Sequence, residues 1–159
     1  MNTNEYDVKI VNVVDGDTVD VDINLGFGVE LKDERVRIMG IDTEESRTRD
    51  RVEDLFGEAA KTRVKELMSE GAKLITTEDR HGEDMKGKFG RILGDFRLPS
   101  GKTLTETLIE EHHAVPYHGQ SKDDIRAQHL ANRTVLLERG VVSQADYDSA
   151  MKLMEDRGN

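Results

Sequence analysis

The chain has 159 residues, with 23 lysines and arginines against 33 aspartates and glutamates, a formal net charge of −10 and no cysteine. The length predicts a single domain that can bury its own core, and the missing cysteine excludes disulfides and thiolate metal sites. The acidic balance argues against tight, passive binding of a polyanion, because such binding relies on basic surface. A bound cation and a few arginines can still reverse the potential locally.

Three predicted strands open the chain, at residues 6–14, 19–23 and 29–39. Along the second strand valine and isoleucine alternate with aspartate, which is typical of a strand with one buried face. Asp15-Gly16 forms the first turn and residues 24–28 form the second. We expect the third strand to bend near residues 32–34. Because no helix separates these strands, they predict an antiparallel meander.

A long amphipathic helix follows the meander. Its apolar stripe covers residues 53–70, and Gly71 ends it. Two further strands are predicted at residues 72–78 and 91–98, with a short helix over residues 104–113 behind them.

The C-terminal part carries two helix-capping signals. Ser121 with Asp124 predicts a helix over residues 121–138, and Ser143 with Asp146 predicts a second helix that continues to residue 155.

These elements together predict the fold class and its division. Five strands with a helix between the third and the fourth indicate an α+β protein built on a five-stranded OB-type barrel with three helices, plus an extra C-terminal helix. We expect residues 1–140 to form the barrel domain and residues 141–159 to form a C-terminal helical extension.

The end of the third strand carries the residues with the most chemistry. After Gly40, the loop Asp42-Thr43-Glu44-Glu45 gathers three carboxylates and a hydroxyl, and Arg37 lies on the strand before it. Hard oxygen atoms are the ligands that calcium and magnesium prefer, and a guanidinium matches the geometry of a phosphate. This stretch therefore predicts a site for a divalent cation and a phosphate.

Two other stretches carry the same kinds of side chain, carboxylates in one and basic groups in the other. Val14-Asp15-Gly16-Asp17-Thr18 is a tight turn with two carboxylates, and Lys88-Phe89-Gly90-Arg91 is a basic, glycine-containing loop that enters a strand. Each stretch alone is a weak signal, because Asp-Gly is a common turn dipeptide. The three stretches in this order are a much stronger one.

In these three stretches, and in the order of its elements, the chain resembles the staphylococcal nuclease (thermonuclease) family over about residues 6–140. The resemblance implies an enzyme, a metal-dependent endonuclease that hydrolyses phosphodiester bonds in DNA and RNA with a calcium ion and leaves 3′-phosphates. It also implies a preference for single-stranded or frayed substrate, because the pocket of the family takes an unstacked nucleotide.

The resemblance also assigns roles to residues. Two carboxylates and one backbone carbonyl are the implied calcium ligands, from Asp17, Asp42 and Thr43. A carboxylate near the attacking water and two guanidinium groups on the scissile phosphate are the implied catalytic groups, from Glu45, Arg37 and Arg91. The implied substrate contacts are Lys88, Phe89 and Tyr117.

Two positions depart from the pattern of the family. Glu44 stands where proline is common, which is expected to loosen the loop and to add a charge beside the cation site. Phe89 stands where many members carry tyrosine, which removes a hydroxyl group near the phosphate.

The alternative function is a catalytically silent nuclease-like domain that binds nucleic acid or a protein. A phosphodiesterase acting on small nucleotides is a third hypothesis. Silent relatives typically lose the charged set, and this chain retains it, which favours the enzyme.

The polar, acidic N-terminus and the lack of a long apolar run predict a protein of the cytoplasm that does not insert into a membrane. The sequence does not set the oligomeric state, and a monomer is the simpler expectation.

Overall fold

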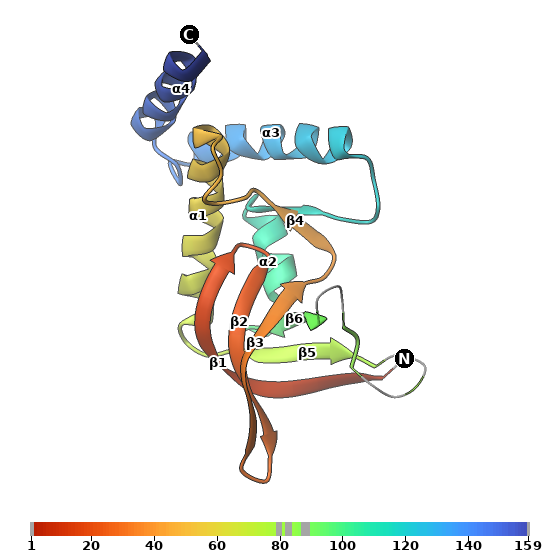
Figure 1. Cartoon of the computed structure of the whole chain (residues 1–159). Helices are drawn as coiled ribbons and strands as arrows, with labels where there is room; N and C mark the ends of the chain where they lie inside the picture. Colours follow the sequence, from red (N-terminus) through yellow and green to blue (C-terminus); the bar gives the residue numbers. More distant parts are fainter. Residues whose placement is uncertain (1, 79–80, 82–83, 87–89, 159) are drawn as a thin grey trace.

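The computed structural model describes residues 2–78, 81, 84–86 and 90–158 of the chain. In this part of the chain, five strands close into a barrel in the order β1-β2-β3-β6-β5 (Figure 1). The strands are β1 (Thr3–Asp15), β2 (Thr18–Gly26), β3 (Val29–Ile38), β5 (Lys73–Thr77) and β6 (Ile92–Arg97). The predicted α+β fold with a five-stranded OB-type barrel is therefore confirmed.

The barrel is a meander that is closed by two later strands. β2 pairs antiparallel with β1 and with β3, and Val19 lies opposite both Val13 and Val36. β6 then runs parallel to β3, with Ile92 beside Val36, and β5 joins β6 to β1. The valine and isoleucine positions that alternate in the sequence point inward and are buried, so the two-residue period placed the core correctly.

The hairpin between β2 and β3 extends away from the barrel (Figure 1). The expected bend in β3 lies at Asp33, which has a φ of 54°, and its N–H donates to Asp22 Oδ1 at 2.8 Å. The pairing between the strands shifts between Val21 and Ile23 at the same level. At the tip, Phe27 is fully exposed.

The helices cover one side and one end of the barrel (Figure 1). They are α1 (Arg51–Met68), α2 (Leu104–Glu110), α3 (Lys122–Glu138) and α4 (Gln144–Gly158). Asp50 caps α1 by accepting hydrogen bonds from the N–H groups of Val52 and Glu53, so this helix begins earlier than predicted. The predicted caps Ser121 and Ser143 are both present. α2 ends before His112, which has a left-handed φ of 66°.

Two short strands were not predicted. β4 (Ile41–Thr43) and β7 (Ala114–Pro116) form a separate two-stranded antiparallel sheet, in which Asp42 lies opposite Val115. This sheet lies between the barrel and α3 (Figure 1). It fixes the backbone of the carboxylate-rich stretch.

A second hydrophobic cluster lies outside the barrel. It joins α1, α3 and α4 through the buried side chains Val52, Phe56, Leu136, Val142 and Ala150. The C-terminal helix thus packs on α1, and the proposed domain boundary at residue 140 stays a prediction. None of the helices in the described ranges is both long enough and apolar enough to cross a bilayer.

Candidate active site

The turn between β1 and β2 brings Asp17 against β4. Gly16 makes this approach possible, because a Cβ atom there would lie 3.0 Å from Thr43 Cγ2 and 3.0 Å from Ala60 Cβ. The Asp17 carboxylate accepts a hydrogen bond from Thr18 Oγ1 at 3.0 Å. The turn and β4 are therefore packed against each other, although they are separated in sequence by all of β2 and β3.

Arg37 connects the same two segments from β3. Its Nη1 donates to the carbonyl of Ile38 at 2.7 Å and to that of Asp17 at 3.4 Å. Its Nη2 donates to the carbonyl of Ile41 at 3.1 Å and lies 3.5 Å from Asp17 Oδ2. The guanidinium is thus held between the Asp17 turn and the residue that precedes Asp42.

Asp42 projects from β4 toward α3. Its Oδ2 lies 2.7 Å from Nε2 of His129, and the carboxylate can only accept, so the histidine Nε2 carries the hydrogen. Asp42, Thr43 and Glu45 line one side of a cavity of about 210 Å³, and α3 lines the other side with Lys122, Ile125, Arg126 and His129. Two of the three predicted cation ligands, Asp42 and Thr43, therefore face a helix with a row of basic side chains, and Asp17 is not among the described residues that line this cavity.

Glu44 does not loosen the loop as the sequence suggested. Its side chain is only 9% exposed and accepts hydrogen bonds from Arg133 Nε at 3.0 and 3.1 Å, with a third bond from Nη2. Burial raises the pKa of the Glu44 carboxyl, and the Arg133 guanidinium acts against that rise. Arg133 also stacks over the Phe56 ring at 5.3 Å. The charge at position 44 is paired with α3, and the loop is tied down by it.

Glu45 lies at the surface, and its backbone rests on α1. A Cβ atom at Gly57 would lie 2.4 Å from the carbonyl carbon and oxygen of Glu45 and 2.6 Å from the nitrogen of Ser46. No other residue type fits this contact. On the far side of the same loop, Ser46 Oγ donates to Asp15 Oδ1 at 2.5 Å. Gly57 and Asp15 thus hold the backbone of the loop at Glu45 and Ser46 in place.

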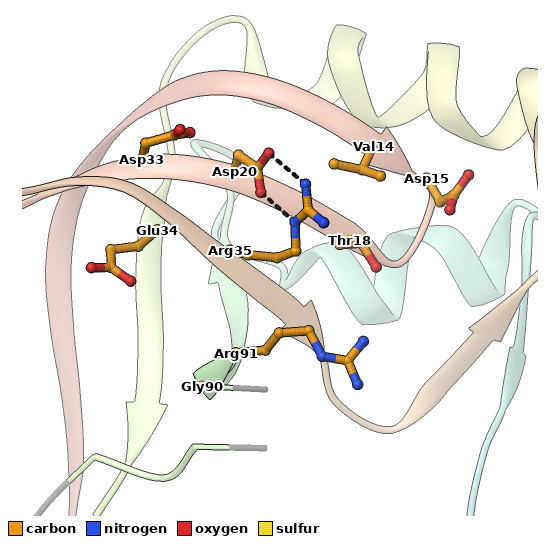
Figure 2. Close-up of a pocket in the computed structure, with 9 residues that line it drawn as sticks. All are labelled: Val14, Asp15, Thr18, Asp20, Asp33, Glu34, Arg35, Gly90 and Arg91. Carbon is orange, nitrogen blue, oxygen red and sulfur yellow. Dashed lines mark hydrogen bonds and ion pairs between the residues drawn. The ribbon is translucent and has the colours of Figure 1, made fainter. Parts of the chain in front are cut away.

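Arg91 enters from the start of β6 and lines a second cavity of about 640 Å³ with Thr18, Asp15 and Arg35. Figure 2 shows its guanidinium pointing toward the end of the cavity where Thr18 and Asp15 lie. Between this end and the end that carries Asp33 and Glu34, Arg35 donates to both carboxylate oxygens of Asp20, at 2.8 and 3.1 Å (Figure 2). Arg91 therefore lies toward the Thr18 end of this cavity, and none of Asp17, Asp42, Thr43 and Glu45 is among the described residues that line it.

The predicted substrate contacts are only partly described. Tyr117 follows β7, is 49% exposed, and its N–H donates to the carbonyl of Gly40 at 2.9 Å. Its backbone therefore lies beside the turn that precedes β4, and its aromatic ring is exposed. Lys88 and Phe89 lie outside the described residues.

The donor set fits a calcium ion in its chemistry. Gly16, the neighbour of Asp17, packs against the Thr43 side chain, and Arg37 links Asp17 to the segment before Asp42. Among the described residues, no three histidine, aspartate or glutamate side chains form a metal cluster. A cation here would depend on the two carboxylates, the Thr43 carbonyl and water, and calcium accepts such a set because it tolerates several waters.

The structure adds three residues that sequence reasoning missed. His129 and Arg133 contact the loop from α3, and Gly57 contacts it from α1. The spacing of four residues between His129 and Arg133 was a visible signal that both lie on one helical face. Nothing in the neighbourhood of Gly57 marks it, because a single glycine in a helical pattern is tolerated for many reasons.

Comparison with known proteins bears on the family of the chain. A search of curated proteins with the whole chain finds no significant match. The family model described as staphylococcal nuclease homologue matches residues 35–135, which is more than half of the chain and runs from β3 into α3. With the closed five-stranded barrel, this match shows that the chain belongs to the staphylococcal nuclease homologue family.

Proposed function

We propose that this protein is a calcium-dependent nuclease that hydrolyses phosphodiester bonds in DNA and RNA and leaves 3′-phosphate products. One observation carries the proposal beyond family membership. The Asp17 turn, Arg37 and β4 form one packed unit, in which Gly16 contacts Thr43 and Arg37 contacts both the turn and the Ile41 carbonyl. Residues from two separate stretches of sequence, the turn at residues 16–17 and the segment 37–43, are thereby held together.

We assign each residue of the site one role in this reaction. The Asp17 and Asp42 carboxylates and the Thr43 carbonyl would hold the cation. Calcium, when bound, polarises a phosphoryl oxygen and makes a neighbouring water easier to ionise. Glu45 is exposed at the cavity, and its carboxylate would accept the proton of the attacking water or orient that water.

Arg37 and Arg91 would bind the oxygens of the scissile phosphate. Negative charge grows on these oxygens in the transition state, so donors that are already in position stabilise it most. Arg37 is held in position by backbone carbonyls. A lysine could not replace either residue fully, because an ammonium group does not make the bidentate contact of a guanidinium.

The substrate preference rests on Tyr117 and on the net charge. An exposed aromatic ring stacks well on an unpaired base. A net charge of −10 gives little general attraction for a duplex. We therefore propose that single-stranded or frayed DNA and RNA are cut faster than intact duplex.

The test is cleavage of denatured DNA and of RNA by the purified chain with calcium, magnesium or a chelator. Arg91→Ala is expected to lower the calcium-dependent rate by about a hundred- to a thousandfold, the effect of removing one preorganised transition-state donor. Glu45→Ala is expected to lower it by about a hundred- to ten-thousandfold, the effect of removing a general base. Arg139→Ala and Glu70→Ala, at exposed positions at the ends of α3 and α1, are matched controls that should leave the rate unchanged. Cleavage that survives both site variants would exclude this site.

A silent nuclease-like domain is the second candidate, and one observation favours it. The Arg37 guanidinium already donates to three backbone carbonyls and lies near Asp17, so a phosphate must compete with these contacts. Retained binding of nucleic acid without cleavage under any metal would support this candidate over the enzyme.

A further inference from the structure

The two residues that flank Thr43 are both bound by α3. Asp42 Oδ2 lies 2.7 Å from His129 Nε2, and the Glu44 carboxylate accepts hydrogen bonds from Arg133. His129 and Arg133 are each 8% exposed, so both contacts lie at the buried side of the helix. The loop and the helix are therefore joined at two points, one on each side of Thr43.

The two contacts can form together because the spacing of two residues along a strand is close to the length of one helical turn. Asp42 lies in β4 and Glu44 directly follows that strand, and residues two apart along a strand share a face and are separated by about 6.6 Å. Residues 129 and 133 are one turn apart on a helix, so they also share a face and are separated by about 6 Å. An extended segment and a helix can thus run alongside each other and make both contacts without distortion.

The arginine contact holds the helix in this position. The Arg133 guanidinium is bonded to both oxygens of Glu44 and stacked over the Phe56 ring of α1, 5.3 Å from its centroid. A bidentate contact fixes both distance and orientation. α3 consequently cannot slide along the loop, and His129 is kept opposite Asp42.

We infer that His129 is a positioning residue for the cation site. Its Nε2–H orients the Asp42 carboxylate, and the Arg133–Glu44 pair holds the backbone of Thr43 between the two contacts. A ligand that is already oriented loses less rotational freedom when a cation binds, and the outer hydrogen-bond partners of metal ligands commonly change affinity for that reason. This inference rests on the proposed calcium site and adds α3 to it.

The test compares two amides at position 129 that differ in reach. A glutamine amide nitrogen occupies about the place of histidine Nε2, whereas an asparagine amide reaches only about as far as Nδ1. Calcium affinity of the whole chain is measured by titration calorimetry, and the melting temperature is recorded for each variant. His129→Asn is expected to weaken calcium binding by about ten- to a hundredfold, and His129→Gln to stay within about threefold of the unsubstituted chain.

Activity supplies a second measurement. In His129→Asn the calcium concentration for half-maximal cleavage should rise while KM for denatured DNA at saturating calcium stays unchanged. A purely structural role would lower the melting temperature and leave calcium affinity the same in both variants. His118→Asn, at an exposed loop position, is the matched control and should bind calcium like the unsubstituted chain.

The outcomes separate this inference from the proposed function. Equal calcium affinity in the unsubstituted chain, His129→Gln and His129→Asn overturns the positioning role alone, and so does an equal loss in both variants. An unsubstituted chain that binds no calcium overturns the calcium site and the positioning role together.

Discussion

Gly57→Ala tests how closely α1 controls the site. The added methyl group would lie 2.4 Å from the backbone carbonyl of Glu45, whereas carbon atoms in contact prefer about 3.5 Å or more. Neither partner is a flexible side-chain end, so the loop or the helix must move by about 1 Å. A misplacement of this size costs about a hundredfold in rate when it affects a catalytic group. The expected result is a calcium-dependent cleavage rate about a hundredfold lower.

The substitution should not unfold the protein. Alanine gains about 0.5–1 kcal/mol over glycine inside a helix, while overpacking costs about 1–3 kcal/mol, so the net loss is on the order of 1 kcal/mol. The assay is cleavage of denatured DNA, with thermal unfolding of the same preparation. Thr62→Ala, at an exposed position on α1, is the control. Wild-type activity in Gly57→Ala would refute the claim that this contact sets the position of Glu45.

Three further predictions concern the stability of the protein and the contact made by Gly16. Arg133→Met should lower the unfolding free energy by about 3–5 kcal/mol, because it leaves the Glu44 carboxylate buried without its partner. The double variant that combines Arg133→Met with Glu44→Leu should regain most of the lost unfolding free energy. Urea denaturation of the single and the double variant tests this. Burial lowers the pKa of His113 from its ordinary value of 6.5. The contribution of this residue to the unfolding free energy is therefore complete above pH 6.5, and it is lost as the pH falls from there toward the pKa of His113 in the folded state. In His113→Leu, the unfolding free energy from urea denaturation should fall less between about pH 7.5 and 5.5 than in the unsubstituted chain. An equal fall in both proteins would contradict the role given to His113. Gly16→Ala meets side chains at 3.0 Å, so its cleavage rate should fall less than that of Gly57→Ala, and the reverse order would count against the contacts described.

The strands of the barrel and the starts of two helices were predictable because each is indicated by residues that are close together in the sequence. Alternating valines mark the core face of β2, and Ser121 and Ser143 mark helix starts within four residues of themselves. β4 and β7 were missed because each has three residues, too few to show a period. The parallel pairing of β3 with β6 depends on closure of the whole sheet, which no local pattern encodes.

The site was predictable only in part. Its residues were identified through a resemblance, and their roles stay predictions. The effect of Glu44 was misjudged because its partner, Arg133, lies 89 positions further along the chain. In a single sequence, a buried glutamate and a distant buried arginine look like two ordinary surface charges. Burial and pairing at this separation emerge only from the packing of α3 on the loop.

The Glu44–Arg133 pair also bears on when the protein becomes active during its synthesis. A ribosome adds about 5–20 residues per second, so Glu44 waits about 4 to 18 seconds before Arg133 exists. His129 is made in the same late interval, so Asp42 lacks its partner until then as well. The barrel strands are complete before α3 begins, but the loop that carries Asp42 and Glu44 is not yet held. Under the proposed cleavage of RNA, this order leaves the site unfinished while most of the protein's own messenger is still being translated.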